Sequence, residues 1–317
     1  MSEFELIARY FTRPVRRAAL GVGDDCALLA PAEGMQLAIS TDMLVEGRHF
    51  LSTVSPQRLG HKALAVNLSD LAACGAEPLA FTLALALPRA DESFLAPFAA
   101  GLLALAEEHG AELIGGDITA GPLNICITVF GQVPRGQALL RSGARAGDEL
   151  WVSGCLGDAR LALEVFRGMV RLAGAEFDEV REAMECPKPR VALGRALRGL
   201  ASSAIDLSDG LVGDLGHVLA ASHVGAVIHV DALPRSAMLA GQSPQLQRQC
   251  VLAGGDDYEL LFTAPVQQRE AVEAAARLCG VAVTRIGCIQ AAPGLLVLDS
   301  QGRAVEMNWR GFDHFAG

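Results

Sequence analysis

Segments typical of strands and of helices alternate along this chain, and that alternation restricts its fold more than any other feature of the sequence. In the first half, short apolar runs predict strands at 36–40, 81–87, 112–114 and 123–133. The pair Ser55-Pro56 is typical of a helix start and Gly75 of a helix end, and a second helix is predicted over 93–109. This mixture predicts an α/β or α+β class.

A change in composition divides the chain into two parts. Gly, Arg and Ala dominate around 134–148, and at roughly 150 residues per domain a chain of 317 residues suits two domains. We therefore predict an N-terminal α/β domain at 1–137 and a C-terminal α/β domain at 138–317. The second part has its own series of elements, with strands predicted at 149–153, 204–207 and 259–263 and helices at 211–222 and 270–279.

The charge balance and the rarity of lysine exclude several classes of protein. The chain holds 26 basic and 36 acidic residues, so its formal net charge is −10, which argues against a general binder of nucleic acid or of anionic membranes. No apolar run reaches the roughly 18–20 residues that a membrane-spanning helix needs. Lys62 and Lys188 are the only lysines, neither lies in a P-loop motif, and the protein-kinase sequences H-R-D and D-F-G are absent.

The cysteines indicate a reducing environment. Eight cysteines are scattered singly, with no C-x-x-C pair, so the spacing of a zinc site is absent. The N-terminus carries acidic residues and no apolar run behind a basic segment, so it does not look like a secretory signal. We therefore expect free thiols and a cytoplasmic location. Cys26, which precedes an apolar segment, is predicted to be a core residue.

Aspartates beside glycine or at predicted strand ends recur in both halves and carry the most information about function. The groups are Gly21-Val-Gly-Asp-Asp25, Ile39-Ser-Thr-Asp42, Leu113-Ile-Gly-Gly-Asp117, Ile205-Asp-Leu-Ser-Asp-Gly210 and Gly254-Gly-Asp-Asp-Tyr-Glu-Leu260. Because Gly and Asp are ordinary turn residues, each group alone also has a purely structural explanation. Asp70 differs, since a turn cannot explain an aspartate inside an otherwise apolar helix. Asp158 and Asp214 are predicted to be helix caps or solvated helix positions.

A divalent cation would explain the acidic groups together. Asp70 and Asp206 lie in apolar surroundings, where an unpaired carboxylate is rare, and two lysines cannot neutralise so many acids. Oxygen ligands without Cys or His select Mg²⁺, Ca²⁺ or Mn²⁺ rather than zinc. Magnesium also binds substrate phosphates, so an acidic site can hold a polyphosphate through metal ions.

Three further features each allow two explanations. Arg141 could clamp a phosphate by a bidentate contact or form a surface ion pair. His49 could contact a ligand, although a histidine in this setting is more often an ordinary loop residue. The aromatic tail at 309–315 could be a docked terminus or could cover a ring-shaped ligand.

In combination, these motifs resemble the thiamine-monophosphate kinase family, within the superfamily that also holds aminoimidazole ribonucleotide synthetase and selenophosphate synthetase. The resemblance covers nearly the whole chain, from Glu3 to Phe315. The motifs that carry it are Gly21-Val-Gly-Asp-Asp-Cys-Ala27, Ser40-Thr-Asp42, Lys62-Ala-Leu-Ala-Val-Asn-Leu-Ser-Asp-Leu-Ala-Ala73, Ile114-Gly-Gly-Asp117, Arg141-Ser-Gly143, Ile205-Asp-Leu-Ser-Asp-Gly210 and Gly254-Gly-Asp-Asp-Tyr-Glu-Leu260.

The resemblance implies a two-domain fold like that of aminoimidazole ribonucleotide synthetase, with N-terminal strands at the interface of a homodimer. It implies transfer of the γ-phosphoryl group of ATP to thiamine monophosphate, with several Mg²⁺ ions. The implied metal ligands are Asp25, Ser40, Thr41, Asp42, Asp70, Asp117, Asp206 and Asp209. The implied ATP contacts are Gly116, Asp117, Arg141 and Ser208. The implied contacts with thiamine monophosphate are His49, Asp256 and Phe312.

Two positions depart from the pattern of the family. The family often has Glu where this chain has Asp256, which keeps the charge but shortens the reach of the carboxylate. Phe312 stands where other members can carry Trp or Tyr, which keeps a stacking ring but removes a hydrogen-bond donor.

The expected mechanism is direct in-line attack by the substrate phosphate, without a covalent enzyme intermediate. No activated Ser, Cys or His is evident, and a phosphate monoester is already largely ionised at pH 7, with a second pKa of about 6. Two alternatives stay open. One is another ATP-dependent enzyme of the superfamily, such as selenophosphate synthetase, which uses a reactive Cys or selenocysteine near its N-terminus. The other is a non-catalytic acidic protein that binds Mg²⁺ and nucleotide.

Overall fold

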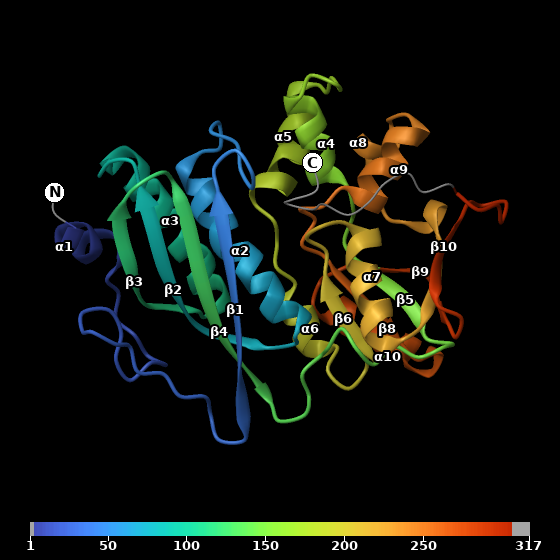
Figure 1. The fold of residues 1–317 in the computed structure, drawn as a ribbon, viewed down its shortest axis with the longest axis horizontal. Coiled ribbons are helices and arrows are strands. Elements are labelled where there is room, and N and C mark those ends of the chain that lie inside the picture. The colour runs from blue at the N-terminus through green and yellow to red at the C-terminus, as the bar shows by residue number, and fades with distance from the viewer. Residues whose placement is uncertain (1–2, 306–317) are drawn as a thin grey trace. The chain divides into compact units, whose positions relative to one another are not determined.

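The computed structural model describes residues 3–305, which divide into two compact units (Figure 1). The first unit comprises the chain up to Leu71 together with Ala76–Gly136. The second comprises Ala72–Gly75 together with the chain from Gln137 onward. Each unit contains one β-sheet with its own helices, so the mixed α/β class predicted from the sequence is confirmed.

The first unit is built on a four-stranded sheet in the order β1-β4-β2-β3. Its strands are β1 (Met35–Val45), β2 (Glu77–Leu87), β3 (Glu112–Ala120) and β4 (Asn124–Pro134). β4 pairs antiparallel with both β1 and β2, whereas β2 and β3 run parallel. Because parallel neighbours need a crossover connection, α3 (Glu92–His109) joins them. β1 and β3 are therefore the two edge strands.

Two helices lie together on one face of this sheet, α2 (Pro56–Ala73) and α3 (Figure 1). Their backbones approach closely at two glycines. A Cβ on Gly60 would lie 2.0 Å from the carbonyl oxygen of Phe98, and a Cβ on Gly101 would lie 1.9 Å from that of Gln57. The close crossing buries Phe98 completely and holds α2 firmly in the core of the unit.

The opposite face of the sheet is covered only in part by the described residues. The chain begins with α1 (Glu3–Leu6) and the π-helical turn η1 (Ile7–Phe11), and the segment that follows packs Ala18 against Ala80 and Ile114. The N-terminal segment does not cover β1 on this face of the sheet. The side chains of Leu37, Ile39 and Met43, which alternate along β1 on this face, are 41%, 59% and 53% exposed. We call these three residues the apolar face of β1.

The second unit is built on a six-stranded sheet in the order β10-β7-β9-β5-β8-β6. Its strands are β5 (Glu149–Ser153), β6 (Ser203–Asp206), β7 (Gly225–His229), β8 (Leu260–Ala264), β9 (Val283–Gln290) and β10 (Gly294–Leu298). Its helices are α4 (Asp158–Phe166), α5 (Gly174–Glu185), α6 (Val191–Ala196), α7 (Leu211–Ser222), α8 (Ala237–Ala240), α9 (Pro244–Ala253) and α10 (Arg269–Leu278), with 3₁₀ turns η2 (Val230–Ala232) and η3 (Val266–Gln268).

Two predicted strand ends were wrong, and both errors concern acidic groups. β1 continues through Asp42 to Val45, and β3 continues through Asp117 to Ala120. The pair Gly115-Gly116 does not end β3: the register shifts at Ile114, and the two glycines then pair with Thr82 and Leu83 of β2. Gly116 has φ 146°, and a Cβ there would lie 1.9 Å from the carbonyl oxygen of Leu83. This position therefore requires glycine for a close approach inside the sheet.

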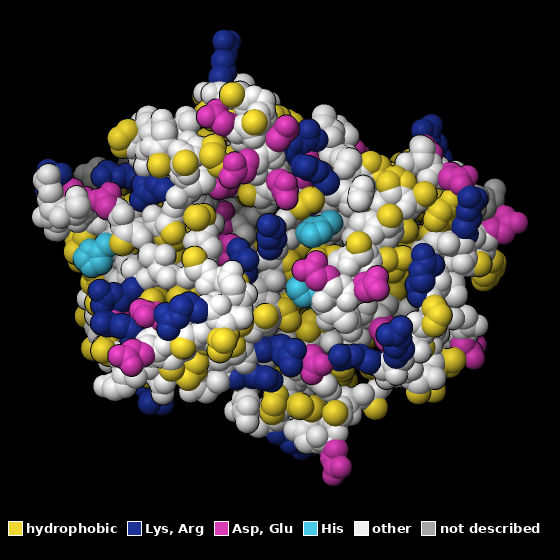
Figure 2. Space-filling view, turned by 180° about the vertical axis from the view of Figure 1, so that it is seen from behind, with side chains coloured by type: hydrophobic (Ala, Val, Ile, Leu, Met, Phe, Trp, Pro, Cys, Tyr) yellow, Lys and Arg dark blue, Asp and Glu magenta, His cyan; other side chains and the backbone are white. Residues whose placement is uncertain are grey.

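The surface carries both signs of charge. On the face shown in Figure 2, basic and acidic side chains are interspersed with apolar ones. Among residues 3–305, no helix combines the length and the apolar character needed to cross a membrane.

Candidate active site

The acidic group formed by Ser40, Asp42 and Asp70 connects β1 to α2. Ser40 donates its hydroxyl to Asp70 Oδ2 at 2.5 Å, and the backbone N–H of Asp42 donates to Asn67 Oδ1 at 3.0 Å. Asn67 is buried, and its Nδ2 donates to the carbonyl oxygen of Ala63 at 3.0 Å, which fixes the orientation of its amide. Because Asn67 and Asp70 are three residues apart on one helix, they face the same strand. The structure therefore brings together Ser40, Asp42 and Asp70, as the sequence suggested.

The register of the sheet separates Asp117 from this group. In one row across the strands, Asp42 is opposite Ile127, Ile127 is opposite Leu83, and Leu83 is opposite Gly116. Since side chains alternate between faces, Asp42 lies on the helix-covered face and Asp117 on the other, together with Thr41. Three strand spacings of about 4.8 Å place the two aspartates roughly 14 Å apart. One chain alone does not bring Asp42 and Asp117 to one point.

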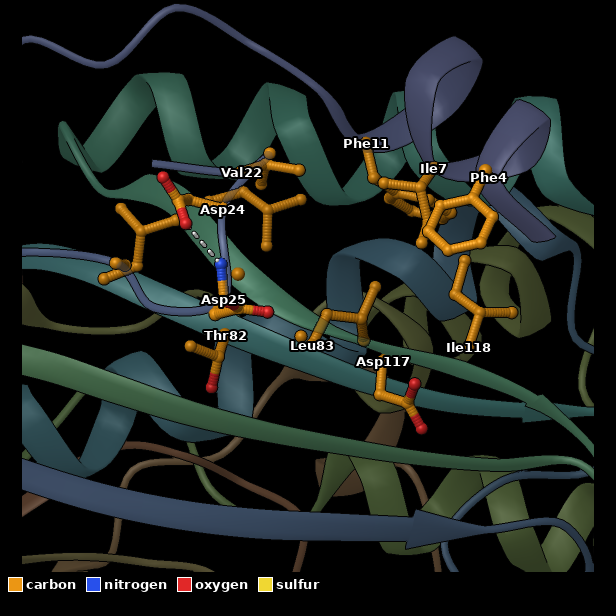
Figure 3. A pocket seen from close by; sticks show the side chains of 16 residues that line it. Phe4, Ile7, Phe11, Val22, Asp24, Asp25, Thr82, Leu83, Asp117 and Ile118 are labelled. Carbon is orange, nitrogen blue, oxygen red and sulfur yellow. Dashed lines mark hydrogen bonds between the residues drawn. The ribbon is translucent and has the colours of Figure 1, made fainter. Parts of the chain in front are cut away.

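Asp117 instead lines a pocket at the β3 edge (Figure 3). The pocket has a volume of about 630 Å³ and is shared by Asp25, Gly116 and Asp117, three residues that the sequence assigned to metal or ATP. Its other walls are largely apolar. Phe4 and Ile7, from the N-terminal helical segment, lie near Leu83 and Ile118, whereas the loop that carries Asp24 and Asp25 lies apart from them (Figure 3). One cavity thus offers both an acidic, glycine-lined wall and an apolar wall.

His49 is held by the turn that follows β1. Its Nδ1 accepts a hydrogen bond from the backbone N–H of Val45 at 3.0 Å. A nitrogen that accepts cannot carry a proton, so the neutral ring of His49 is protonated at Nε2. The turn itself is closed by a bond of 2.8 Å from the N–H of Gly47 to the carbonyl oxygen of Phe50. His49 is therefore an ordered residue with a defined tautomer.

The second unit gathers its predicted residues beyond the end of β6. Asp206 is the last residue of β6 and is buried, and Ser208 and Asp209 follow in the turn before α7. The backbone N–H of Asp256 donates to the carbonyl oxygen of Ser208 at 2.8 Å, and that of Tyr258 donates to Leu207 at 2.8 Å. A predicted ATP contact, Ser208, and a predicted substrate contact, Asp256, are therefore neighbours in space.

The loop that carries Asp256 is conformationally strained. Asp256 and Tyr258 have φ of 59° and 49°, in the left-handed region that a bulky residue such as Tyr seldom occupies. The hydroxyl of Tyr258 donates to Asp256 Oδ1 at 3.2 Å, which orients the carboxylate. Asp adopts this backbone conformation more readily than Glu, because its short side chain can bond locally. Asp256 therefore suits the backbone of this chain.

Buried and half-buried polar groups form further hydrogen bonds with the same loop. Glu259 accepts hydrogen bonds from Ser153 Oγ at 2.5 Å and from Arg190 Nε at 2.7 Å. Asp257 Oδ1 accepts the N–H of Gly157 at 2.8 Å, yet burial raises the pKa of the Asp257 carboxyl well above its usual range. Arg190 could not be predicted from the sequence, because an arginine beside prolines is typical of many surface loops.

Arg141 lies at the other end of α7 from Ser208. Its carbonyl oxygen accepts the hydroxyl of Ser222, the last residue of α7, at 3.2 Å. The adjacent Leu140 accepts the N–H of Ala204, near the start of β6. Eight residues of helix separate Ser222 from Asp214, which is about 12 Å at 1.5 Å per residue. The backbone of Arg141 therefore lies far from the Ser208 turn, and only its long side chain extends the reach of this residue.

Asp214 holds the turn that carries Ser208 and Asp209. Its Oδ2 accepts the backbone N–H groups of Ser208, Asp209 and Gly210, each at 3.1 Å. Burial, and then the charge of Asp209, raise the pKa of Asp214 to about 7, while the three donors act in the opposite direction. The sequence predicted a cap or a solvated position for Asp214. The side chain is instead 3% exposed and bonded to the loop.

The donor atoms of these groups are carboxylate and hydroxyl oxygens, which suit a hard cation such as Mg²⁺. Within residues 3–305, no three His, Cys, Asp or Glu side chains converge as a ready-made metal site. Phe312, the third predicted substrate contact, lies outside the described residues. Cys26 was predicted to be a core residue, and this was wrong, because its side chain is exposed.

Known proteins are similar to this chain along almost its entire length. Residues 23–133 match the model of the AIR synthase related protein, N-terminal domain, and residues 145–298 match that of the C-terminal domain. The thiamine-monophosphate kinase of Salmonella typhimurium is 48% identical over 322 residues, covering 99% of this chain and 98% of the relative. That of Escherichia coli is 47% identical over 320 residues, with the same coverage of both chains.

Solved structures agree with the sequence relatives. The thiamine-monophosphate kinase of Stenotrophomonas maltophilia K279a has a TM-score of 0.86 and 44% identity, covering 95% of this chain and 96% of that one. AaThiL complexed with AMPPCP and TMP has a TM-score of 0.79 and 31% identity, covering 90% of this chain and 89% of that one. Structures of the hydrogenase maturation protein HypE, near 21% identity, share the fold alone.

The two matched domains place the chain in the AIR synthase related family. Within that family the chain belongs to the thiamine-monophosphate kinases, by identity over its full length and by structure. The resemblance found from the motifs is thereby confirmed, and so is the predicted enzyme class, a thiamine-phosphate kinase.

Proposed function

We propose that this enzyme transfers the γ-phosphoryl group of ATP to the phosphate of thiamine monophosphate by direct in-line attack, giving thiamine diphosphate and ADP. The relatives are kinases of thiamine monophosphate, and AaThiL was solved with AMPPCP and TMP. The observation that carries the proposal for this chain is the main-chain bond between Ser208 and Asp256. The bond makes the residue that we propose to bind nucleotide a neighbour of the one that we propose to bind the acceptor, as transfer between two bound molecules requires.

The acidic groups supply the binding sites for several Mg²⁺ ions in this proposal. Their ligands are Asp25, Ser40, Thr41, Asp42, Asp70, Asp117, Asp206 and Asp209. When bound, Mg²⁺ supplies positive charge that offsets the repulsion between two phosphorylated anions. The bond from the Ser40 hydroxyl to Asp70 and the bond from the Asp42 backbone N–H to Asn67 hold three of these ligands in place before any ion binds.

ATP is bound by Gly116, Asp117, Arg141 and Ser208 in this proposal. The pocket that contains Gly116 and Asp117 has a volume of about 630 Å³, within the usual range for a small-molecule site. Thiamine monophosphate is bound by His49, Asp256 and Phe312. His49 presents an Nε2 proton to its surroundings, and Asp256 gives a carboxylate to a substrate whose thiazolium ring is positively charged.

The enzyme acts as a homodimer in this proposal, with the apolar face of β1 at the interface. Leu37, Ile39 and Met43 form an exposed apolar strip on an edge strand, and such strips are typical of interaction surfaces. Since β1 and β3 are the two edges of the sheet, a second copy whose β3 lies beside β1 can also bring Asp117 of one chain towards Asp42 of the other. We further propose a cytoplasmic location, supported by eight cysteines that stand singly in the sequence, with no C-x-x-C pair.

The proposal is tested by incubating the purified enzyme with ATP, Mg²⁺ and either thiamine monophosphate or free thiamine. We expect ADP and thiamine diphosphate in equal amounts from thiamine monophosphate, and no turnover of thiamine. Activity should keep rising with free Mg²⁺ after all ATP is complexed, because ions bound by the protein are also needed. Turnover of free thiamine, or ADP release without thiamine diphosphate, would contradict the proposal.

A further inference from the structure

One carboxylate outside the predicted ligand set controls the geometry of the Ser208 turn. A single oxygen of Asp214, Oδ2, accepts three consecutive backbone N–H groups, those of Ser208, Asp209 and Gly210, at 3.1 Å each. The side chain is almost fully buried. Three donors on one oxygen fix the orientations of three successive peptide groups, and with them the directions in which the side chains of Ser208 and Asp209 point.

Helix capping alone does not explain this arrangement. Gly210 is the residue before α7, and it provides no side chain to cap the helix. In a capping box, the side chain three residues into the helix reaches back to one N–H, that of the capping residue. Asp214 is one residue further along, and it reaches past Gly210 to two residues that lie wholly outside the helix. The bonds therefore order the preceding loop rather than the helix end.

The other side of the same turn is fixed as well. The carbonyl oxygens of Leu207 and Ser208 accept the N–H groups of Tyr258 and Asp256, both at 2.8 Å. The turn is thus bonded through its N–H groups to Asp214 and through its carbonyl groups to the loop of Asp256. Removing the carboxylate of Asp214 breaks the bonds that hold these three N–H groups and so allows the turn to move relative to that loop.

We infer that Asp214 is a positioning residue, which sets the nucleotide-side residues Ser208 and Asp209 against the acceptor-side residue Asp256. This inference rests on the proposed function, because it takes the roles of these three residues from it. Asp214 touches neither substrate in this account. It acts by holding one turn so that both substrates meet in line, and small displacements of such a turn are enough to reduce the rate strongly.

The experiment compares the wild-type enzyme with Asp214→Asn and Asp214→Ala in steady-state kinetics and thermal melting. Asn has almost the same volume and retains one acceptor oxygen without the charge, whereas Ala removes the acceptor. Glu176→Gln is the matched control, because Glu176 is also a first-turn carboxylate that accepts a backbone N–H, that of Ala173 at 3.0 Å, but on α5. All assays are run well below the melting temperature of each variant.

We expect kcat/KM to fall for both substrates in the order wild type, Asn, Ala, by about tenfold or more for Ala, while Glu176→Gln keeps wild-type kinetics. Calorimetric titration with Mg·ATP should show weaker binding by Asp214→Ala as well. Unchanged kinetics in folded variants that melt at a lower temperature would overturn the inference, because Asp214 would then be purely structural. A wild-type enzyme that binds Mg·ATP but does not phosphorylate thiamine monophosphate would instead refute the proposed function.

Discussion

The two units hold their acidic groups by different means. In the first, Asp42 and Asp117 lie inside strands, so the register of the sheet decides the face on which each carboxylate lies. In the second, Ser208, Asp209 and Asp256 lie in loops beyond β6, where main-chain hydrogen bonds set their positions. The second unit thus assembles its group locally, whereas in our proposal the first unit completes its group with a second copy of the chain.

The largest effect is expected from Asp70→Asn. This change removes a ligand charge beside Ser40 but almost no volume, so kcat/KM should fall by about a thousandfold or more while the circular dichroism spectrum and melting temperature stay close to wild type. Asp91→Asn is the control. Asp91 caps α3 by accepting the N–H of Ser93, and Asn is about as good a helix cap as Asp, so that variant should keep both its stability and its activity. Full activity of Asp70→Asn would remove Asp70 from the site.

The second prediction concerns the apolar face of β1. Ile39→Asp places a charge in the middle of this face and should weaken the dimer by about tenfold or more, with activity falling in parallel. Sedimentation at several protein concentrations measures the association. Leu278→Asp is the control, because Leu278 is 90% exposed at the end of α10 and outside this face. If Ile39→Asp has the same sedimentation coefficients and the same activity as wild type, the interface lies elsewhere.

A smaller effect is expected from Tyr258→Phe. It removes the hydroxyl that donates to Asp256, and a hydrogen bond of this kind contributes roughly 0.5–1.5 kcal/mol. The KM for thiamine monophosphate should therefore rise by about threefold, with little change in the KM for ATP. Tyr10→Phe is the matched control, since the buried hydroxyl of Tyr10 has no hydrogen-bond partner among the described residues. Equal behaviour of the two variants would show that Tyr258 does not orient Asp256.

The smallest effect is a pH dependence of stability that Asp257 causes. Burial raises its pKa in the folded state above the usual 3.8, so above pH 4 the folded protein holds a proton that the unfolded chain has lost. The stability from this proton is complete below pH 4 and is lost as pH rises through the folded-state pKa. The side chain of Asp257→Asn can still accept the N–H of Gly157 but carries no charge to bury. At pH 8 its free energy of unfolding should therefore be about 1 kcal/mol larger than that of wild type.

Asp299→Asn provides a control of opposite sign for this prediction. Backbone and side-chain hydrogen bonds from Arg303 lower the pKa of the Asp299 carboxyl, so its charged form stabilises the fold above the unfolded-state pKa. This variant should therefore lose stability at neutral pH. Chemical unfolding at pH 5 and pH 8 measures both variants. An Asp257→Asn variant whose stability falls towards pH 8 as steeply as that of wild type would contradict the assignment.

Local patterns in the sequence were enough to predict much of the fold. Apolar periodicity and helix signals such as Ser55-Pro56 predicted α2, α3, α7 and α10 within a few residues. The same patterns missed β7, β9 and β10, which are short or carry polar residues, and whose strand character depends on pairing within the sheet. The mid-helix Asp70 was found because nothing local explains an acid in that position.

Other parts of the site could not be predicted, because they depend on contacts between distant residues. The face on which Asp42 lies is set by pairing with β4, more than 80 positions further along the chain. Asp214 looked like an ordinary first-turn acid, since its three bonds run to a turn whose shape the sequence does not reveal. Asn67 was overlooked for a similar reason, as its partner Asp42 lies on another element.

In our proposal Asp42 and Asp117 act in one site to which two chains contribute, and a mixing experiment tests this arrangement. Asp42→Asn and Asp117→Asn are each expected to be inactive alone. When the two are unfolded, mixed and refolded together, half of the dimers should be mixed, and each of these should hold one site free of both substitutions. We therefore predict recovery of about a quarter of wild-type activity. No recovery, with mixed dimers shown to be present, would contradict the account.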